Sequence, residues 1–263
     1  MEDNCKNCGT LITGNFCSNC GQKKYKRIDR KYLIDELQYT FLHTNKGFFY
    51  SVKNIIKNPG KSARDFIDGN RVNHYKPLLL AFVLTGLSTF ISFKILNAGK
   101  IMEAAYEKQK IPKTFIHDMM TFMSNYNSLV MLLFIPFVSI ITYLLFKNWK
   151  NNYYEHVIMN AFIQNFYNVS CIIILYPILF LLKYISTDTY LVVSMLYLLI
   201  FPFILYWFYR EFYFEKSQAD VILKVVLFIV LGIVAYIVVV ILAIIGMLAY
   251  YGPEKFVKIF AVQ

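Results

Sequence analysis

The sequence lacks the motifs that mark common catalytic sites. It contains no H-E-x-x-H motif, no G-x-S-x-G motif and no paired acids within its long apolar runs. The letters Gly60-Lys61-Ser62 resemble the end of a phosphate-binding loop, but such a loop needs a glycine five positions before Gly60, where Ile55 stands. We therefore expect a protein that is not an enzyme, and we assign no catalytic residue.

Cysteine is scarce outside the first 20 residues, and no signal peptide is evident. The chain opens with MEDNCKNCG rather than with a basic flank and an apolar run. Of the five cysteines only Cys171 lies further along, where we expect a small buried hydrophobic residue. This distribution argues against a disulfide framework and favours a reducing compartment for the amino-terminal segment.

Charged residues are also few, at 16% of the chain, whereas 57% of residues are hydrophobic and the mean hydropathy is +0.47. That apolar surplus exceeds what a soluble globule can bury, so it indicates contact with lipid. A membrane helix needs about 20 apolar residues to cross a hydrocarbon core of about 30 Å. Five such spans are predicted, at residues 77–97, 127–147, 156–182, 189–209 and 221–250.

The predicted fold class is therefore an all-α polytopic membrane protein, with a five-helix transmembrane bundle and a small amino-terminal zinc ribbon. The expected parts are a zinc ribbon (1–22), basic amphipathic juxtamembrane helices (23–76), a transmembrane domain (77–251) and a tail (252–263). Three prolines within spans, Pro136, Pro177 and Pro202, should kink their helices.

The amino-terminal cysteines have the spacing C-x2-C-x8-C-x2-C, formed by Cys5, Cys8, Cys17 and Cys20. A glycine follows each pair, which lets the backbone turn tightly around the thiolates. Four thiolates at this spacing suit tetrahedral zinc, and the metal would supply folding energy that so small a module cannot obtain from a core. We expect a structural zinc site; a redox switch and a nucleic-acid reader are the alternatives.

The segment between the cysteines and the first span predicts short helices. Leu33, Leu37 and Phe41 recur at four-residue spacing, which indicates an amphipathic helix over 29–43. A second apolar cluster runs from Phe48 to Asn58, and Pro59-Gly60 should end that helix. Ser62 and Asp65 can then cap a third helix that runs through Ile67 and ends at Gly69. We expect these helices on the membrane surface or against the spans.

The net charge of +11 is unevenly distributed. With the amino terminus inside, the inner segments hold 19 Lys and Arg and the outer segments hold 7, including those of an expected outer loop over 99–125. Because cytoplasmic segments carry the basic excess, the amino terminus is expected in the cytoplasm. The same charges favour anionic membrane lipids as partners, rather than nucleic acid.

The third span carries a polar stripe. His156, Asn160, Gln164 and Asn168 recur every four residues, and Glu155 adjoins the cytoplasmic end. Unpaired amides are costly in lipid, so this face should turn inward, with Thr85, Ser88, Thr89 and Ser92 of the first span as candidate partners. Hydrogen bonding between helices is the simpler interpretation, and a polar path or ligand pocket is the alternative.

Four stretches carry a family resemblance: CKNCG…FCSNCGQ, KGFFYSVKNIIKNPGKSARDFIDGNRVNHYKP, YYEH, and LYWFYREFYFEKSQADVILK. Together they resemble an uncharacterised bacterial family of zinc-ribbon-headed membrane proteins, which implies a bacterial inner membrane but no activity. The five-span plan also resembles, more loosely, the Yip-type membrane-trafficking proteins.

Two functions are consistent with these features. The first is a non-enzymatic membrane protein whose zinc head and basic neck recruit an unidentified cytoplasmic protein or organise the bilayer. The second is a transporter or channel with a polar path along the third span, which requires a water-accessible cavity beside Asn160 and Gln164. The sequence leaves open whether the chain forms a homo-oligomer.

Overall fold

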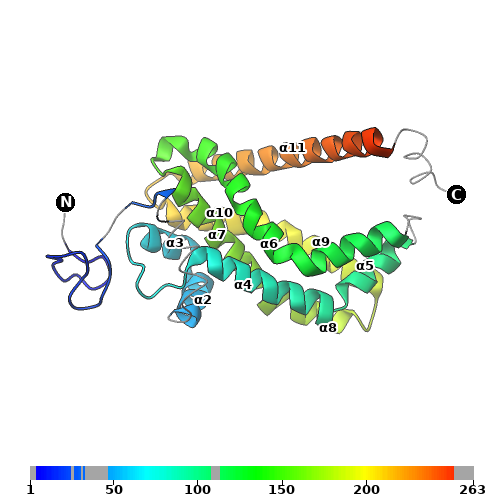
Figure 1. Ribbon diagram of the computed structural model, residues 1–263, viewed down its shortest axis with the longest axis horizontal. Helices are drawn as coiled ribbons and strands as arrows, with labels where there is room; N and C mark the ends of the chain where they lie inside the picture. The colour runs from blue at the N-terminus through cyan, green and yellow to red at the C-terminus, as the bar shows by residue number, and fades with distance from the viewer. Residues whose placement is uncertain (1–3, 25–26, 31, 33–46, 108–112, 252–263) are drawn as a thin grey trace.

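The computed structural model describes residues 4–24, 27–30, 32, 47–107 and 113–251. These residues are helical outside the cysteine-bearing segment, where two isolated β-bridges form and no described residue belongs to a strand. Figure 1 shows this segment, residues 4–24, as a separate head at one end of an elongated helical body. We call that end the head side and the opposite end, toward which α11 runs, the far side.

Five helical segments are long and apolar enough to cross a membrane, which confirms the predicted number of spans. They are Pro77–Ile95, Phe115–Trp149, Tyr153–Leu182, Thr187–Phe212 and Gln218–Gly246. Large apolar side chains cover their outer surfaces; Phe137, Leu144 and Phe203 are each more than 60% exposed. Such a surface is stable in hydrocarbon and not in water, so the chain has the construction of an integral membrane protein.

Several spans are built from more than one helical segment. The segments are α4 (Pro77–Phe90) with a π-helical turn (Ile91–Ile95), α5 (Ala98–Glu107), α6 (Lys113–Phe146) with a 3₁₀ turn (Lys147–Trp149), α7 (Tyr153–Ser170) with a π-helical turn (Cys171–Leu175), α8 (Tyr176–Leu182), α9 (Thr187–Tyr197) with a 3₁₀ turn (Leu198–Ile200), α10 (Phe201–Phe212) and α11 (Gln218–Tyr251).

The three prolines interrupt their spans in different ways. Pro177 lies in the first turn of α8, directly after a π-helical turn, and Pro202 lies in the first turn of α10, directly after a 3₁₀ turn. The first turn of a helix tolerates proline because its backbone N–H groups have no partner inside the helix. Pro136, in contrast, lies inside α6, which remains one helix across it.

The connection between the first two spans, expected as a loop over 99–125, is shorter than expected, and its described part is largely helical. Residues Ala98–Glu107 form α5, and α6 begins at Lys113, so the second span extends well beyond its predicted start at 127. α5 packs against α6, and His117 Nδ1 lies 3.1 Å from Glu103 Oε1 between them. Hydropathy does not report the pairing of α5 with the polar first turns of α6, which explains the error.

The neck helices are α2 (Phe48–Lys57) and α3 (Pro59–Ile67). The predicted start of α3 at Ser62 is wrong: the cap is Asn58, whose side-chain oxygen accepts from Lys61 N at 2.9 Å, and Pro59 occupies the first turn. Asparagine caps a helix about as well as serine does, and a proline directly after the cap favours the earlier start because it is preferred at the first helical position. Gly69 follows α3 with a φ of 113°, as expected for a helix terminator. The helix predicted over 29–43 lies almost entirely outside the described residues.

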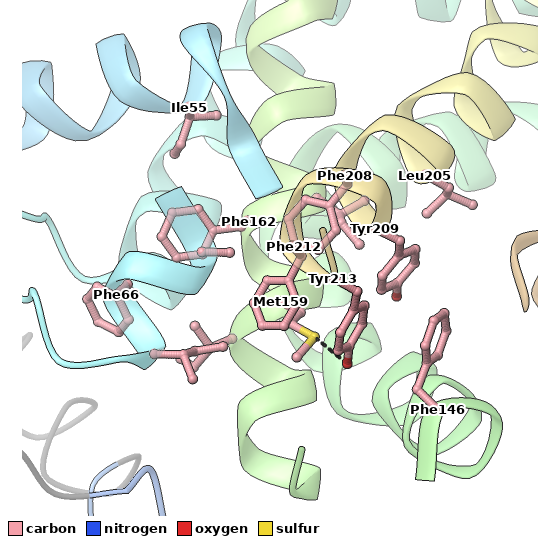
Figure 2. Packing of buried hydrophobic residues seen from close by; sticks show 14 of the residues in the cluster. Ile55, Phe66, Phe146, Met159, Phe162, Leu205, Phe208, Tyr209, Phe212 and Tyr213 are labelled. Atoms are coloured by element: carbon pink, nitrogen blue, oxygen red, sulfur yellow. Dashed lines mark hydrogen bonds between the residues drawn. The ribbon is translucent and has the colours of Figure 1, made fainter. Parts of the chain in front are cut away.

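The neck lies against the spans on the head side. α3 packs on α7 and α10, and α2 packs on α7 and α3. Figure 2 shows Ile55 of α2 and Phe66 of α3 beside Phe162 of α7, and both neck residues are buried. On the other face of α2, Phe49 is 84% exposed.

An aromatic core joins α6, α7 and α10 beneath the neck (Figure 2). Phe146 stacks on Tyr209 with ring centroids 4.4 Å apart, and the Tyr213 hydroxyl lies 3.9 Å from Met159 Sδ. Offset stacking of rings adds to the stability gained by burying their area. This core fixes the head-side half of the bundle, where the polar residues of α7 begin.

Candidate functional site

The four amino-terminal cysteines come together in the head. Their Sγ atoms all lie within 4.8 Å of one another, with Cys5 and Cys20 separated by 3.6 Å and Cys8 and Cys17 by 3.6 Å. These separations are too long for disulfides, whose sulfurs lie about 2.05 Å apart. They are close to the roughly 3.8 Å between sulfurs that a tetrahedral zinc with bonds of about 2.3 Å requires. The head can therefore hold one metal ion.

Two matching turns position the thiols. In the first turn Cys5 N donates to Thr10 O and Gly9 N donates to Cys5 O; in the second, Cys17 N donates to Gln22 O and Gly21 N donates to Cys17 O. Gly9 and Gly21 have φ values of 76° and 74°, a conformation that glycine adopts without strain. The glycines therefore act as the sequence predicted, but the strands of a zinc ribbon do not form among the described residues, which contain only two isolated bridges.

The thiols differ in how readily they ionise. A hydrogen bond with Thr10 lowers the pKa of Cys8 to about 6, and a hydrogen bond with Asn7 lowers that of Cys20. Burial raises the pKa of Cys5 to about 11. Since metals bind the thiolate form, Cys8 is the ligand already suited to a cation at neutral pH, and the lowered pKa of Cys20 shifts that thiol in the same direction.

The head is attached to the helical body at defined points. Asn73 Nδ2 donates to Asn7 Oδ1 at 3.3 Å, and Arg71 N donates to Gln22 Oε1 at 3.4 Å. Just after the head, Ile28 is fully buried in the main core. These contacts fix where the head lies relative to the spans.

Glu155 forms a further attachment and also starts α7. Its carboxylate accepts from Arg27 Nε at 2.9 Å, from Asn151 Nδ2 at 2.9 Å and from the backbone N of Asn152 at 3.0 Å. The Asn152 side chain accepts in return from Glu155 N, which completes a capping box. Glu155, which is 3% exposed, thus joins the segment after the head to the third span.

Asn160 is bonded to α6. Its Nδ2 group lies 3.0 Å from Ser139 Oγ, 3.0 Å from Thr142 Oγ1 and 2.9 Å from the His156 carbonyl oxygen. Asn160 is 7% exposed, and both hydroxyl partners are fully buried. These α6 partners were not predicted, because hydroxyls are common in spans and their helical register alone does not place them opposite α7.

Gln164 and Asn168 are bonded to α4. Both side-chain amides donate to Thr85 Oγ1, each at 2.9 Å, so one of the candidate partners in the first span serves two residues of the stripe. Ser88 and Thr89 bond elsewhere, to the Tyr176 hydroxyl at 2.6 Å and to Asn127 Nδ2 at 2.8 Å. The stripe therefore connects α7 to two neighbouring helices.

The sequence reasoning missed Asn165, which lies off the four-residue stripe. Its side chain is fully buried, and Nδ2 donates to the Pro77 carbonyl oxygen at 3.0 Å. That carbonyl lies in the first turn of α4. The one available indication was chemical rather than periodic: any amide inside a span needs a partner.

His156 differs from the amides of the stripe. Its ring is fully buried, and neither ring nitrogen has a hydrogen-bond partner among the described residues. The rings of Tyr143 and Phe146, one turn apart at the end of α6, each have their centroid 6.1 Å from that of the imidazole. The imidazole is thus held by aromatic packing.

A cavity of about 350 Å³ lies beside Asn160 and Gln164, between α6, α7, the α9–α10 span and α11. Apart from those two amides and Tyr167, its lining side chains are apolar, among them Ile135, Ile163, Leu205 and Phe228. The cavity is therefore at the place where a polar path would need one, but its walls offer little to a polar solute.

The described residues thus define an integral membrane protein with a four-thiol head. A family model described as "Protein of unknown function (DUF3667)" matches residues 45–89, a range that includes α2, α3 and nearly all of α4. This match agrees with the resemblance of the neck to an uncharacterised domain family; it bears on neither a bacterial origin nor the likeness to Yip-type proteins. No curated protein and no solved structure matches the chain.

Proposed function

We propose that this chain is a non-enzymatic membrane protein that presents a zinc-stapled head to a protein partner in the cytoplasm. The observation that carries the proposal is that the head gathers four thiols that can hold a metal ion, lies outside the helical core and is nevertheless fixed to it through Asn7, Gln22 and the segment that includes Arg27. A module used only for tethering would not need a fixed orientation, whereas a module that binds a protein partner needs one to present its binding surface.

The exposed surface of the head supports a protein partner. Leu11 and Phe16, one beside each cysteine turn, are both 59% exposed. Leu11 pairs with Asn4 and Phe16 pairs with Lys23 in the two isolated β-bridges that close these turns. The positions of both apolar side chains are therefore set by the same turns that gather the thiols. Apolar side chains on a rigid small module are typical anchors for a protein interface.

The neck supports a second part of the proposal, contact with anionic lipid. The exposed face of α2 combines the apolar Phe49 and Ile56 with Lys53 and Lys57. This combination suits the boundary between hydrocarbon and headgroups, where basic side chains gain from negative surface charge. The neck would then hold the head close to the bilayer surface.

Zinc is the metal we propose for the four thiols. Replacing Cys17 with serine should release one zinc per chain and unfold the head, while the spans remain inserted because their core does not include the head. Metal analysis of the purified protein, with the membrane fraction as the control for insertion, measures both. Undiminished zinc in the Cys17→Ser variant would show that the metal lies elsewhere.

The partner is tested by photo-crosslinking in the intact membrane. A photoreactive amino acid at Leu11 or Phe16 should yield a discrete protein adduct, and the Cys17→Ser change should abolish it. The control position is Phe137, which is 66% exposed on a span and should react with lipid only. Adducts that survive loss of the metal site, or that form equally at Phe137, would count against recruitment by the head.

The alternative is a path for a polar solute along the stripe, and the cavity beside Asn160 and Gln164 is the observation in its favour. The two functions give different mutational results. If the amides hold helices together, Asn160→Leu should lower thermal stability by about 1 kcal/mol per lost interhelical bond and leave solute flux in vesicles unchanged. Abolished flux with unchanged melting would instead favour the path.

A further inference from the structure

The cavity beside the polar stripe lies deep in the membrane-spanning part of the chain. Ile163, at its wall, is ten residues beyond Tyr153, where the third span begins on the head side. At 1.5 Å per residue, Ile163 lies about 15 Å from that end of the span and about 28 Å from its other end at Leu182, so a hydrocarbon core of about 30 Å placed anywhere within the span includes it. The surroundings of the cavity are therefore the acyl chains of the bilayer rather than water.

The walls of the cavity are chemically matched to hydrocarbon. Ile135, Ile163, Leu205 and Phe228 contribute apolar surface from four different spans. The Asn160 Nδ2 group bonds to two hydroxyls of α6, and the Gln164 amide bonds to Thr85 of α4, so most of the amide donors beside the cavity are already engaged within the bundle. Apolar cavities of this kind exclude water and accept apolar molecules.

The mouth of the cavity opens sideways. Two lining residues, Phe134 of α6 and Leu198 before α10, are 56% and 59% exposed on the outer surface of the spans. α11 contributes Phe228 to the cavity and then runs apart from the rest of the bundle toward the far side, as Figure 1 shows. A molecule in the bilayer can reach the cavity between α6 and the α9–α10 span without leaving hydrocarbon.

We propose that this cavity binds an acyl chain of a membrane lipid, inserted laterally from the bilayer. A volume of about 350 Å³ falls in the range of sites for small apolar ligands. The headgroup remains outside the bundle, because the cavity walls carry no charged side chain that could pair with a phosphate. The protein thus has a specific lipid site in addition to the general contact that any span makes with lipid.

Photoreactive lipids test the site directly. The full-length protein is reconstituted into vesicles of phosphatidylethanolamine and phosphatidylglycerol that contain a phosphatidylcholine with a diazirine in mid-chain, irradiated and mapped by peptide mass spectrometry. Contact with surrounding lipid labels exposed residues such as Leu133, which is 57% exposed. Only a chain inside the cavity can label Ile163 and Leu205, which are 4% and 1% exposed. Labels at both buried residues are expected; labels confined to exposed residues would overturn the proposal.

A filled cavity provides the matched variant. Val138 lines the cavity, whereas Phe137, its neighbour in α6, is 66% exposed to the surroundings. Val138→Trp should reduce labelling of Ile163 and Leu205 at least fivefold and leave labelling of Leu133 unchanged, and Phe137→Trp should change neither. Unchanged cavity labelling in Val138→Trp would also overturn the proposal. If that variant does not fold, the wild-type protein is labelled in competition with an excess of unlabelled lipid of the same chain length. A specific site saturates and general contact does not, so labelling of Ile163 and Leu205 should fall more steeply than labelling of Leu133. An equal fall at all three residues would overturn the proposal.

Discussion

At the scale of single residues, Glu155 makes more stabilising contacts than its position beside the polar stripe suggests. It caps α7, accepts from Asn151 and Asn152, and pairs with Arg27 from the segment after the head. A carboxylate buried to this extent is stable only when charged and hydrogen-bonded partners replace the water it has lost. Glu155 therefore couples the position of the head to the integrity of the third span.

Replacing Glu155 with alanine should lower the free energy of unfolding by about 2 kcal/mol, because a helix cap and a charged hydrogen bond are lost together. Glu155→Gln keeps a capping oxygen and should cost less than half as much. Thermal unfolding in detergent measures both. Glu103→Gln is the control: Glu103 pairs with His117 on an exposed surface, where ion pairs contribute little. Equal losses for Glu155→Ala and Glu103→Gln would contradict the assigned role.

His74 makes a second residue-scale prediction, on pH. It lies between α3 and α4, surrounded by the rings of Tyr50, Phe66 and Phe162, and burial lowers its pKa to about 4. The unfolded chain takes up a proton near pH 6.5 and the folded chain only near pH 4, so acid favours the unfolded state. The free energy of unfolding should therefore fall between pH 6.5 and pH 4, by about 3 kcal/mol at most.

The matched variant is His74→Phe, which preserves the aromatic packing and cannot bind a proton. Melting temperatures at pH 7.5 and pH 5.0 should differ less in this variant than in the wild-type protein, because other acids titrate equally in both. An equal fall in melting temperature in both proteins would show that His74 does not cause the loss of stability in acid.

At the scale of elements, α3 approaches α10 closely at Gly60. A Cβ atom built on Gly60 would collide with the carbonyl oxygen of Phe208 and would lie 2.8 Å from the Glu211 Cβ. The contact is reinforced at its ends, where Asn58 Nδ2 donates to Glu211 Oε2 at 2.6 Å and Arg64 bonds Glu215 at 2.6 Å. The neck thus docks on the fourth span through backbone contact that only glycine permits.

Gly60→Ala should therefore displace α3 from α10. The obstacle is a backbone carbonyl rather than a flexible side chain, so we expect a loss of at least about 2 kcal/mol, in the range of overpacked sites. Hydrogen exchange should rise in α2 and α3 while α11 stays unchanged. The control is Gly232→Ala in α11, where nothing lies within 4 Å and alanine should favour the helix by up to about 1 kcal/mol. Similar effects of the two substitutions would refute a specific docking contact.

At the scale of the whole molecule, five spans that each cross a membrane put the head and the end of α11 on opposite sides of it. Figure 1 agrees with this arrangement, because α11 runs from the head side to the far side. The basic residues predict which side is cytoplasmic: with the head inside, inner segments hold 19 Lys and Arg against 7 outside, so we expect the head in the cytoplasm.

Topology reporters should bear this out. A reporter fused after Gln263 and one inserted between α5 and α6 should both be active outside the cytoplasm, whereas a reporter in the α6–α7 connection should be active inside. Cytoplasmic activity at both of the first two sites would reverse the topology and, with it, the cytoplasmic location proposed for the head.

How far the sequence anticipates the candidate sites depends on the range of the interactions involved. Cysteines at C-x2-C spacing gather because each pair shares one turn, and amides every four residues share a helical face, so both groupings follow from local geometry. Asn165 and the Arg27–Glu155 pair join residues 88 and 128 positions apart, and no local pattern relates such positions.

The sequence by itself determined the number of spans, the thiol cluster and the two glycine turns, since each depends on hydropathy or on spacing within a few residues. The tertiary structure decided the rest. It placed the neck on α7 and α10, made Thr85 the shared acceptor of two amides, and surrounded an apolar cavity with four spans. The reason is physical: in lipid every span is apolar, so hydrophobicity cannot select which helices become neighbours. That choice comes from shape and from a few directional hydrogen bonds, which exist only when the helices are packed.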